Sequence, residues 1–557
     1  MELKGAEIVV RCLEEQGVDV VFGYPGGTVL DIYDALYQHA DTIKHVLVSH
    51  EQHAAHAADG YARATGKVGV CIATSGPGST NLVTGIATAF LDSVPMVAIT
   101  GNVPTRQIGT DSFQEIDITG VTLPITKHNY FVGDIEDLAD TIRDAFRLAA
   151  SGRPGPVLVD IAKDIQQQMG EYEPAAPAGK DEPYRGNPEK IAAAAARINR
   201  AERPFVYFGG GVIAADAEAE VLELADKIDA PIGCSLMGLS GVSTDAERFL
   251  GFEGMHGHYA SSMAMRNADV IIALGARFND RVTGNREKFA QDADIVHIDI
   301  DSSELSKIIP DAHGLAGDLK IVLRQLIDQL EERTHPEWAS FIERKRMHQD
   351  HNQDMREGLT PRSAMLALNE RLDDETPVVT DVGQHQMWAA QHLRFTKPRT
   401  FITSGGLGTM GFGLGAAIGA AFGTNTRSVL VTGDGGLGMN IGELATAVSY
   451  DVPVTVVVMN NHVLGMVRQW QRLFYGKRFS NTTLEGFRRN DFVAIAEAFG
   501  LEAQRVSTPE ELKAAFDASF EASGPVLIEV EIDKDEMVLP MMPPGGTLDD
   551  IIEKVGE

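Results

Sequence analysis

The strongest constraint on the fold is a Gly-Asp-Gly triplet, residues 433–435, which precedes a pair of asparagines that ends at Asn461. Between the two motifs, residues 439–450 have the apolar spacing of a helix, and residues 453–459 form a β-branched run. This order of strand, helix and strand places Asp434 and the asparagines at the same carboxyl edge of a parallel sheet. Their oxygens suit Mg²⁺, and the glycines let phosphates approach the backbone. The pattern therefore predicts a site for a Mg²⁺-bound diphosphate.

The rest of the chain repeats this alternation of short β-branched runs and amphipathic helical runs. Such alternation is typical of parallel βαβ units, so we expect an α/β fold with three consecutive doubly wound parallel-sheet domains. Two polar stretches, residues 171–188 and 334–360, interrupt the pattern and are interpreted as linkers. The three expected domains are residues 1–170, 189–333 and 361–540. Residues 541–557 are expected to form a C-terminal tail or lid.

Composition excludes several classes of partner. The net charge of −31 repels nucleic acid and anionic membranes. Cys12, Cys71 and Cys234 are far apart, which argues against a disulfide framework or a zinc site and favours a reducing, cytoplasmic location. The first residues lack the pattern of a signal or transit peptide. The uncharged stretch 406–423 contains seven glycines, and we interpret it as buried backbone packed against a ligand rather than as a membrane span.

Motifs in the first predicted domain carry groups that could act on a bound ligand. Glu51 opens a helix rich in small residues, where its carboxyl group is either an ordinary helix-terminal acid or a group that handles a proton. The turn that contains Gly76 follows a strand and could present backbone N–H groups. Residues 109–115 include Phe113 and Gln114, and the amide of Gln114 could donate a hydrogen bond to a substrate oxygen.

Two Gly-rich patterns have the spacing of a dinucleotide-binding turn, and only one has the right context. Gly209, Gly211 and Ala214 follow a strand in the middle domain, as such a turn requires. The second pattern, which begins at Gly406, has no acidic residue about 20 positions further on to hold a ribose. We therefore predict a dinucleotide site in the middle domain alone.

Taken in order, the motifs FGYPGG, HEQ, SGPG, GTDSFQE, GARFNDR, SGGLGTMGFG and the Gly-Asp-Gly to Asn-Asn unit resemble the catalytic subunits of acetohydroxyacid (acetolactate) synthases. The resemblance implies thiamine diphosphate, Mg²⁺ and a structural, non-redox FAD. It implies a transferase that decarboxylates pyruvate and adds the two-carbon unit to pyruvate or 2-oxobutanoate, in the biosynthesis of isoleucine, valine and leucine. It also implies a homodimer or homotetramer with active sites between subunits, in a family that works with a small regulatory subunit.

The resemblance assigns roles to individual residues. Glu51 would activate the cofactor through its pyrimidine ring, and Met410 would hold the cofactor in its bent shape. Arg281 would bind the carboxylate of the second 2-keto acid, beside Met466 and Trp470. The remaining assignments are, for the reacting centre, Gly27, Phe113, Gln114 and Lys163; for the metal, Asp434, Asn461 and the backbone carbonyl of Val463; and for the cofactors, Gly76, Gly408, Gly433, Gly435, Gly436, Gly209, Gly210, Gly211, Arg153, Arg277 and Asp299.

Six positions depart from the residues that are usual in that family. Four of them lie in or beside motifs expected at the reacting centre, so they either alter the substrate preference or reflect neutral drift. These four are Thr28 in place of Ala, His53 in place of Gly, Asn102 in place of Gln and Ser112 in place of Ala. The other two are Ser79 in place of Ala and Gly415 in place of Pro.

Three other functions remain open from the sequence. The first is a related thiamine-dependent carboligase, lyase or pyruvate oxidase with a different substrate preference. The second is a catabolic acetolactate synthase, which lacks FAD. The third is a non-catalytic paralogue, which is disfavoured because Glu51, Asp434 and Asn461 are all present.

Overall fold

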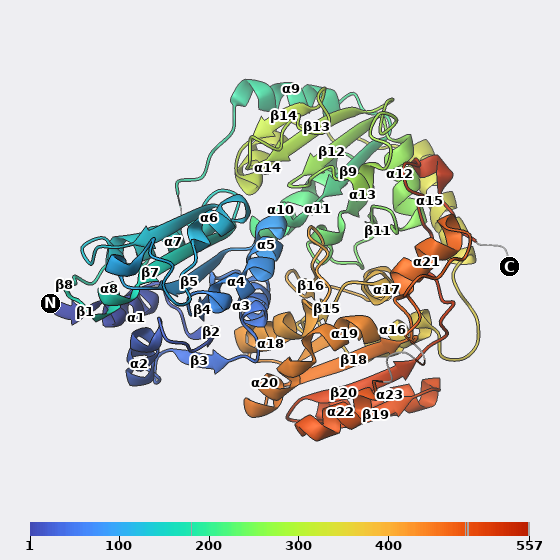
Figure 1. Ribbon diagram of the computed structural model, residues 1–557. Coiled ribbons are helices and arrows are strands. Elements are labelled where there is room, and N and C mark those ends of the chain that lie inside the picture. Colours follow the sequence, from blue (N-terminus) through green and yellow to red (C-terminus); the bar gives the residue numbers. More distant parts are fainter. Residues whose placement is uncertain (180, 485, 487–489, 555–557) are drawn as a thin grey trace.

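Three six-stranded parallel sheets organise the computed structural model, which describes residues 1–179, 181–484, 486 and 490–554 (Figure 1). Each sheet lies within one of the expected domains, and helices connect its strands. Within the described residues, the one further sheet is an antiparallel pair of β1 (Glu2–Lys4) and β8 (Met169–Glu171). The expected α/β fold of three consecutive parallel-sheet domains is confirmed.

In each sheet the chain starts at an inner strand, runs to one edge and then fills the other side. The N-terminal sheet has the order β3 (Lys44–Leu47), β2 (Val20–Tyr24), β4 (Gly69–Ala73), β5 (Met96–Asn102), β7 (Pro156–Ala162), β6 (His128–Val132). The central sheet has the order β11 (Phe249–Phe252), β10 (Ile232–Cys234), β9 (Pro204–Phe208), β12 (Val270–Leu274), β13 (Asp294–Asp299), β14 (His313–Ala316). The C-terminal sheet has the order β16 (Phe401–Ile402), β15 (Val378–Thr380), β17 (Ser428–Gly433), β18 (Val454–Asn460), β20 (Val526–Glu531), β19 (Glu502–Val506).

The strand order reverses beside a predicted motif in every sheet. The reversals lie between β2 and β4, between β9 and β12, and between β15 and β17. Loops leave such neighbouring strands in opposite directions and open a crevice at the carboxyl ends, where α/β proteins bind their ligands. Gly76 follows β4, Gly209 follows β9 and Asp434 follows β17. The fold therefore brings each predicted cofactor motif to a ligand-binding edge.

The N-terminal and C-terminal domains meet along two closely packed helices, α3 (Glu51–Thr65) and α18 (Gly413–Thr424) (Figure 1). A Cβ atom on Gly60 would lie 2.1 Å from the carbonyl oxygen of Ala416, and one on Gly419 would lie 1.8 Å from that of Ala57. The two helix backbones are in contact, and for this reason only glycine fits at these two positions. The prediction that residues 406–423 pack against a ligand is therefore wrong for the helical part, which packs against α3.

Most of the second predicted linker is a helix of the central domain, α15 (Pro336–His351), which packs on α12 (Tyr259–Asn267). The buried indole of Trp338 anchors it, because Nε1 donates a hydrogen bond to the carbonyl oxygen of Pro204 at 3.0 Å. Among the described residues, no helix has the length and apolar character needed to cross a membrane.

The C-terminal tail docks on the central domain. The Met542 N–H donates a hydrogen bond to the Met255 carbonyl at 2.7 Å, and the Asn285 N–H donates one to the carbonyl of Gly546 at 2.8 Å. Met542 is also buried in the core between the central sheet and α12. The predicted lid at 541–557 is thus packed against the protein up to residue 554, and its last three residues lie outside the described chain.

Glu253 is a buried carboxylic acid of the central domain, directly after β11. The residue is 2 % exposed, and neither carboxyl oxygen has a hydrogen-bond partner among the described residues. Burial raises the pKa of Glu253 from 4.5 to about 8, although the nearby hydroxyls of Ser261 and Ser262 act in the opposite direction. The folded protein therefore holds a proton at neutral pH that the unfolded chain has lost.

The free energy of unfolding should fall as the pH rises from about 4.5 to about 8, because only the folded state keeps the Glu253 proton in this window. Glu253→Gln has no such proton. The free energy of unfolding of Glu253→Gln minus that of the wild type should increase by on the order of 3 kcal/mol between about pH 5 and pH 8. Urea denaturation at the two pH values measures the shift, with the exposed Glu497→Gln as control. An identical pH dependence in Glu253→Gln and the wild type would contradict the assignment.

Candidate active site

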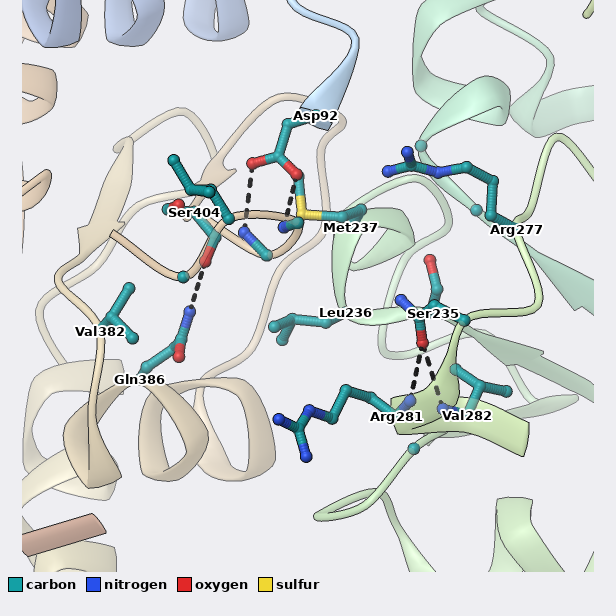
Figure 2. A pocket seen from close by; sticks show the side chains of 18 of the residues that line it. Asp92, Ser235, Leu236, Met237, Arg277, Arg281, Val282, Val382, Gln386 and Ser404 are labelled. Atoms are coloured by element: carbon teal, nitrogen blue, oxygen red, sulfur yellow. Dashed lines mark hydrogen bonds between the residues drawn. The ribbon is translucent and has the colours of Figure 1, made fainter. Parts of the chain in front are cut away.

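A cavity of about 1760 Å³ runs between the central and C-terminal domains, and the N-terminal domain closes one corner of it. Figure 2 shows Ser404 and Gln386 on the C-terminal side, across from Arg277 on the central side. The glycine turns at 209–211 and 433–436 both line it. This volume exceeds the usual size of a site for one small ligand, so the cavity has room for two cofactors along its length.

Asp434 and Asn461 lie at the carboxyl edge of the C-terminal sheet, where the motif places them. Asp434 begins α19 (Asp434–Asn440), Asn461 directly follows β18, and both line the cavity. The helix predicted between them is broken into α19 and α20 (Leu444–Ser449). Burial raises the pKa of Asp434 to about 6, although the N–H of Gly435 and the nearby His462 oppose this rise. A bound cation would stabilise the charged form of this carboxyl group.

The donor set suits Mg²⁺ held jointly by the protein and a diphosphate. Among the described residues, no three His, Cys, Asp or Glu side chains come together as metal ligands. Asp434 offers a carboxylate and Asn461 an amide oxygen, which leaves positions for phosphate and water oxygens, the usual shell of Mg²⁺. Gln384 orients the amide, because its Oε1 accepts a hydrogen bond from Asn461 Nδ2 at 3.1 Å. Gln384 carries no motif, and the sequence analysis missed it.

The other residues predicted to bind thiamine diphosphate from this side also line the cavity. They are Gly408, Met410, Gly433, Gly435, Gly436 and Val463. A Cβ atom on Gly435 would lie 3.5 Å from Met410 Cε, so the methionine side chain is next to the turn that is predicted to bind the diphosphate. The residues that the sequence assigns to the cofactor's shape and to its diphosphate are thus neighbours.

The central-domain end of the cavity has the features of a dinucleotide site. A Cβ atom on Gly209 would lie 2.4 Å from the carbonyl oxygen of Gly275, so the turns after β9 and β12 touch and only glycine fits. Asp299 ends β13, and burial raises its pKa to about 6. Arg153 reaches the site from the N-terminal domain and lies 3.2 Å from Asp301. Gly210, Gly211 and Arg277 line the cavity beside them.

Arg281 presents a weakly paired guanidinium group to the cavity. It lies on α13 (Asp280–Thr283) and lines the cavity (Figure 2). The Asn279 side chain caps the helix by accepting the Arg281 N–H at 3.1 Å. The side chain is 59 % exposed, and its partner carboxylate, on Asp280, is 3.8 Å away. Met466 and Trp470 line the same cavity from α21 (Gly465–Phe474). A carboxylate that entered the cavity would therefore meet a weakly paired cation beside an apolar wall.

Apart from Arg153, which lines the cavity, the predicted residues of the N-terminal domain form a separate group. Glu51 accepts a hydrogen bond from Asn81 Nδ2 at 2.9 Å, and Lys163 donates one to the Gly27 carbonyl at 2.9 Å. Gly76 touches Gln114, since a Cβ atom on Gly76 would lie 2.8 Å from that of Gln114. Phe113 is 87 % exposed. Of the described residues that line the cavity, none belongs to this group.

The unusual residues mostly contact other protein groups. The Thr28 hydroxyl lies 3.0 Å from that of Thr74 and accepts the Ser75 N–H at 2.9 Å, which joins the loops after β2 and β4. His53 Nδ1 lies 2.9 Å from Glu443 Oε1 in a buried contact between domains. Gly415 faces His53, because its Cβ atom would lie 3.1 Å from the His53 carbonyl oxygen. Two departures from the family pattern therefore meet across the α3–α18 contact.

The remaining three positions have different surroundings. Ser79 is buried, and its hydroxyl donates a hydrogen bond to the Gly76 carbonyl at 2.9 Å. Asn102 is buried, and its Nδ2 donates a hydrogen bond to Asp160 Oδ2 at 2.5 Å. Ser112 lies in an exposed turn, where its hydroxyl is 2.8 Å from that of Thr110. Asn102 thus links the end of β5 to the neighbouring strand β7, which carries Asp160.

Comparison with known proteins identifies the family. Residues 3–121 match the thiamine pyrophosphate enzyme N-terminal TPP binding domain, 191–326 match its central domain and 381–530 match its C-terminal TPP binding domain. The acetolactate synthase isozyme 2 large subunit of Escherichia coli is 45 % identical over 99 % of this chain and 100 % of its own length. The chain belongs to the acetolactate synthase large-subunit family. A large subunit of Corynebacterium glutamicum is 44 % identical over 100 % of this chain and 91 % of its own.

Membership of the acetolactate synthase family confirms thiamine diphosphate as the cofactor, because both TPP binding domains are matched. Glu51 lies in the matched N-terminal domain, whereas Asp434 and Asn461 lie in the matched C-terminal domain. Most of the predicted residues that lie apart from the cavity therefore belong to the matched N-terminal TPP binding domain. The predicted residues that line the cavity come mainly from the matched central and C-terminal domains.

Asp434→Asn should weaken Mg²⁺-dependent binding of thiamine diphosphate by about tenfold or more, because a neutral amide replaces the carboxylate that is predicted to bind the cation. Quenching of intrinsic fluorescence during Mg²⁺ titration at fixed cofactor concentration measures this effect. Asp451→Asn is the matched control, since Asp451 is exposed and asparagine tolerates its left-handed backbone, with φ of 48°. An unchanged Mg²⁺ requirement in Asp434→Asn would remove Asp434 from the metal site.

Proposed function

We propose that this chain is the catalytic subunit of an acetolactate synthase that joins two small 2-keto acids with loss of carbon dioxide. Pyruvate is the donor, and a second pyruvate or 2-oxobutanoate is the acceptor, which gives 2-acetolactate or 2-aceto-2-hydroxybutanoate for branched-chain amino-acid synthesis. The observation that carries the proposal is the full-length similarity to acetolactate synthase large subunits, with Glu51, Asp434 and Asn461 all in place. We assign the enzyme to the cytoplasm.

Thiamine diphosphate, when bound, supplies a carbon nucleophile and an electron sink for decarboxylation. The Glu51 carboxyl group would hold a proton at the pyrimidine ring, and Asn81 would keep that carboxyl group in place through its hydrogen bond at 2.9 Å. Met410 would support the bent shape of the cofactor. Asp434, Asn461 and the carbonyl oxygen of Val463 would hold Mg²⁺ against the diphosphate.

The acceptor would bind in the cavity between Arg281 and α21. The guanidinium of Arg281 is free to pair with a carboxylate in the bidentate manner that arginine favours. Met466 and Trp470 would enclose the methyl or ethyl group of the acceptor. This arrangement selects small 2-keto acids by charge at one end and by apolar contact at the other.

A complete site would need a second copy of the chain. Gly27, Glu51, Phe113, Gln114 and Lys163 lie apart from the cavity, so we propose that they complete the site of a partner subunit in a homodimer or homotetramer. A small regulatory subunit is a further proposed partner, because the relatives are named large subunits.

FAD would occupy the central-domain end of the cavity. The turn at 209–211 would carry its diphosphate, with Arg153, Arg277 and Asp299 around it. The proposed reaction is redox-neutral overall, so this cofactor would be structural. The test of the whole function is to incubate the purified protein with Mg²⁺, thiamine diphosphate, FAD and pyruvate. One acetolactate per carbon dioxide is expected, with competition by 2-oxobutanoate; acetate with flavin reduction would instead indicate an oxidase.

Glu51→Gln should lower the rate of acetolactate formation by about a hundredfold or more, because glutamine cannot exchange a proton with the pyrimidine ring. Loss of the C2 proton of bound cofactor, followed by hydrogen–deuterium exchange, should slow in parallel. Glu7→Gln, in the same domain and away from the predicted site, is the control. Normal turnover by Glu51→Gln with bound cofactor would exclude the assigned role.

Arg281→Lys should raise the KM for the acceptor by about tenfold while it changes the rate of carbon dioxide release much less, because lysine keeps the charge but not the bidentate geometry. Product ratios with mixed pyruvate and 2-oxobutanoate measure the effect on acceptor choice. The exposed Arg286→Lys is the control. Equal KM values for the two variants would place the acceptor carboxylate elsewhere.

A further inference from the structure

One wall of the cavity is a loop without regular secondary structure, residues 403–410, between β16 and α18. Its members Ser404, Gly405, Gly406, Leu407, Gly408 and Met410 line the cavity. A loop that carries cofactor-binding groups needs a fixed shape to orient them. Since no helix or strand supplies that shape, it must come from the side chains around the loop.

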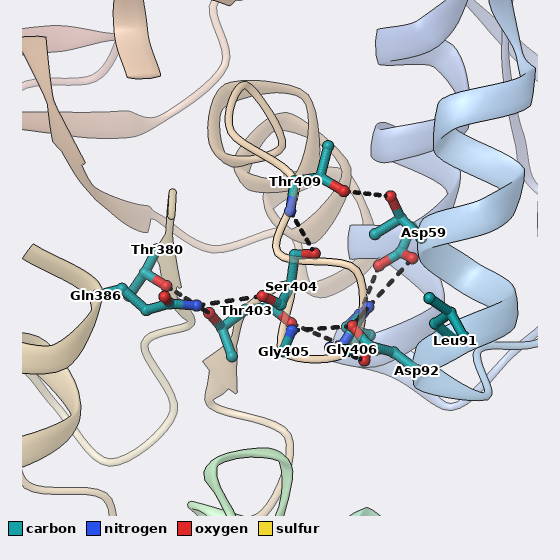
Figure 3. Close-up of polar contacts among 12 residues, drawn as sticks. Asp59, Leu91, Asp92, Thr380, Gln386, Thr403, Ser404, Gly405, Gly406 and Thr409 are labelled. Atoms are coloured by element: carbon teal, nitrogen blue, oxygen red, sulfur yellow. Dashed lines mark hydrogen bonds and ion pairs between the residues drawn. The ribbon is translucent and has the colours of Figure 1, made fainter. Parts of the chain in front are cut away.

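Asp92, the last residue of α5 (Val83–Asp92), contacts this loop from the N-terminal domain (Figure 3). Its carboxylate accepts the N–H of Gly405 at 3.2 Å and that of Gly406 at 2.7 Å. The Asp92 side chain is fully buried, so water does not compete for these bonds. A Cβ atom on Gly406 would lie 2.7 Å from Asp92 Oδ1, so this contact requires glycine at position 406.

Arg63 on α3 holds Asp92 and the loop together. Its Nη2 lies 3.0 Å from Asp92 Oδ2, and its Nη1 donates a hydrogen bond to the Thr403 carbonyl at 2.9 Å. Its Nε lies 2.5 Å from Asp59 Oδ1. Burial alone would lower the pKa of Arg63, but Asp59 and Asp92 raise it, so the guanidinium keeps its charge. The result is a buried network that joins α3 and α5 to three peptide groups of the loop.

The opposite side of the loop is held by the C-terminal domain. Gln386 on α17 (Gln384–His392) donates hydrogen bonds to Thr403 Oγ1 at 2.7 Å and to the Ser404 carbonyl at 3.2 Å (Figure 3). Near the end of the loop, the Thr409 hydroxyl lies 2.8 Å from that of Thr88 on α5. The loop is therefore fixed between two domains immediately before Met410.

We propose that Asp92 and Arg63 are positioning residues for thiamine diphosphate, because they fix the loop that presents Gly408 and Met410 to the cofactor. The inference rests on the proposed role of Met410. Donors from Arg63, Gly405 and Gly406 converge on Asp92, and a carboxylate can accept all three. An asparagine would turn its NH₂ group toward one of these donors, and the loop would lose its defined position.

Asp92→Asn and Arg63→Lys should each raise the Kd of thiamine diphosphate by about tenfold or more, which corresponds to the loss of a charge-assisted hydrogen bond. Both variants should also change the near-ultraviolet circular dichroism of the bound cofactor and lower kcat more than they raise the KM for pyruvate. Glu220→Gln is the matched control, because Glu220 is also a buried carboxylate paired with an arginine, and it lies in the central domain away from the loop.

Met410→Ala separates this inference from the proposal on which it rests. Weaker binding by Met410→Ala, with normal affinity and spectrum in both Asp92→Asn and Arg63→Lys, would overturn the inference and leave the role of Met410 intact. Normal binding by Met410→Ala would overturn both. A lower stability of Asp92→Asn without weaker cofactor binding would show that the network only supports the fold, which also overturns the inference.

Discussion

The contact between α3 and α18 fixes the relation between the two TPP binding domains within the chain. Because Gly60 and Gly419 let the helix backbones touch, small changes of angle or spacing would produce steric overlap. Glu51 opens one of these helices, and the loop that carries Met410 leads directly into the other. The contact between these two helices therefore sets the relative positions of Glu51 and Met410 within the chain.

A buried carboxylate strengthens the same junction. Glu443, from the C-terminal domain, accepts the N–H groups of Ser49 and His50 at 3.0 Å, just before α3 begins. A negative charge at this end of a helix is favoured by the unpaired N–H groups and the helix dipole. Glu443 and Asp92 thus act in the same way at two places, each satisfying backbone donors of the neighbouring domain with a carboxylate that water does not reach.

The sequence was sufficient to predict features that follow from the order of strands and helices, although residues 334–360, interpreted as a linker, contain α15. The parallel sheets follow from alternating β-branched and helical runs, and the place of Asp434 and Asn461 follows from the order of strand, helix and strand. Asp92 could not be found this way, because its partners Gly405 and Gly406 are more than 300 residues away in the chain. Neither residue type nor spacing marks it as different from any other aspartate at a helix end.

The glycines are a second case in which the sequence did not identify the correct partner. The Gly-rich stretch at 406–423 predicted close packing against a ligand, and for the helical part that partner was wrong. In the structure the stretch has two different neighbours, since Gly406 accommodates Asp92 whereas Gly419 accommodates α3. Gly408 in the same stretch has a φ of 71° and no atom within 4 Å of an added Cβ, so its glycine meets a backbone requirement rather than a close neighbour.

The docking of the C-terminal tail has a consequence for how the chain acquires its structure during synthesis. Met542 and Leu548 belong to the buried core of the central domain, whose strands lie between Pro204 and Ala316, more than 200 residues earlier in the chain. During synthesis, the strands of the central sheet leave the ribosome long before Met542 and Leu548 are made. Domains generally fold as units, the N-terminal ones first. The core of the central domain therefore stays partly exposed to solvent until the tail that contains Met542 and Leu548 has been made.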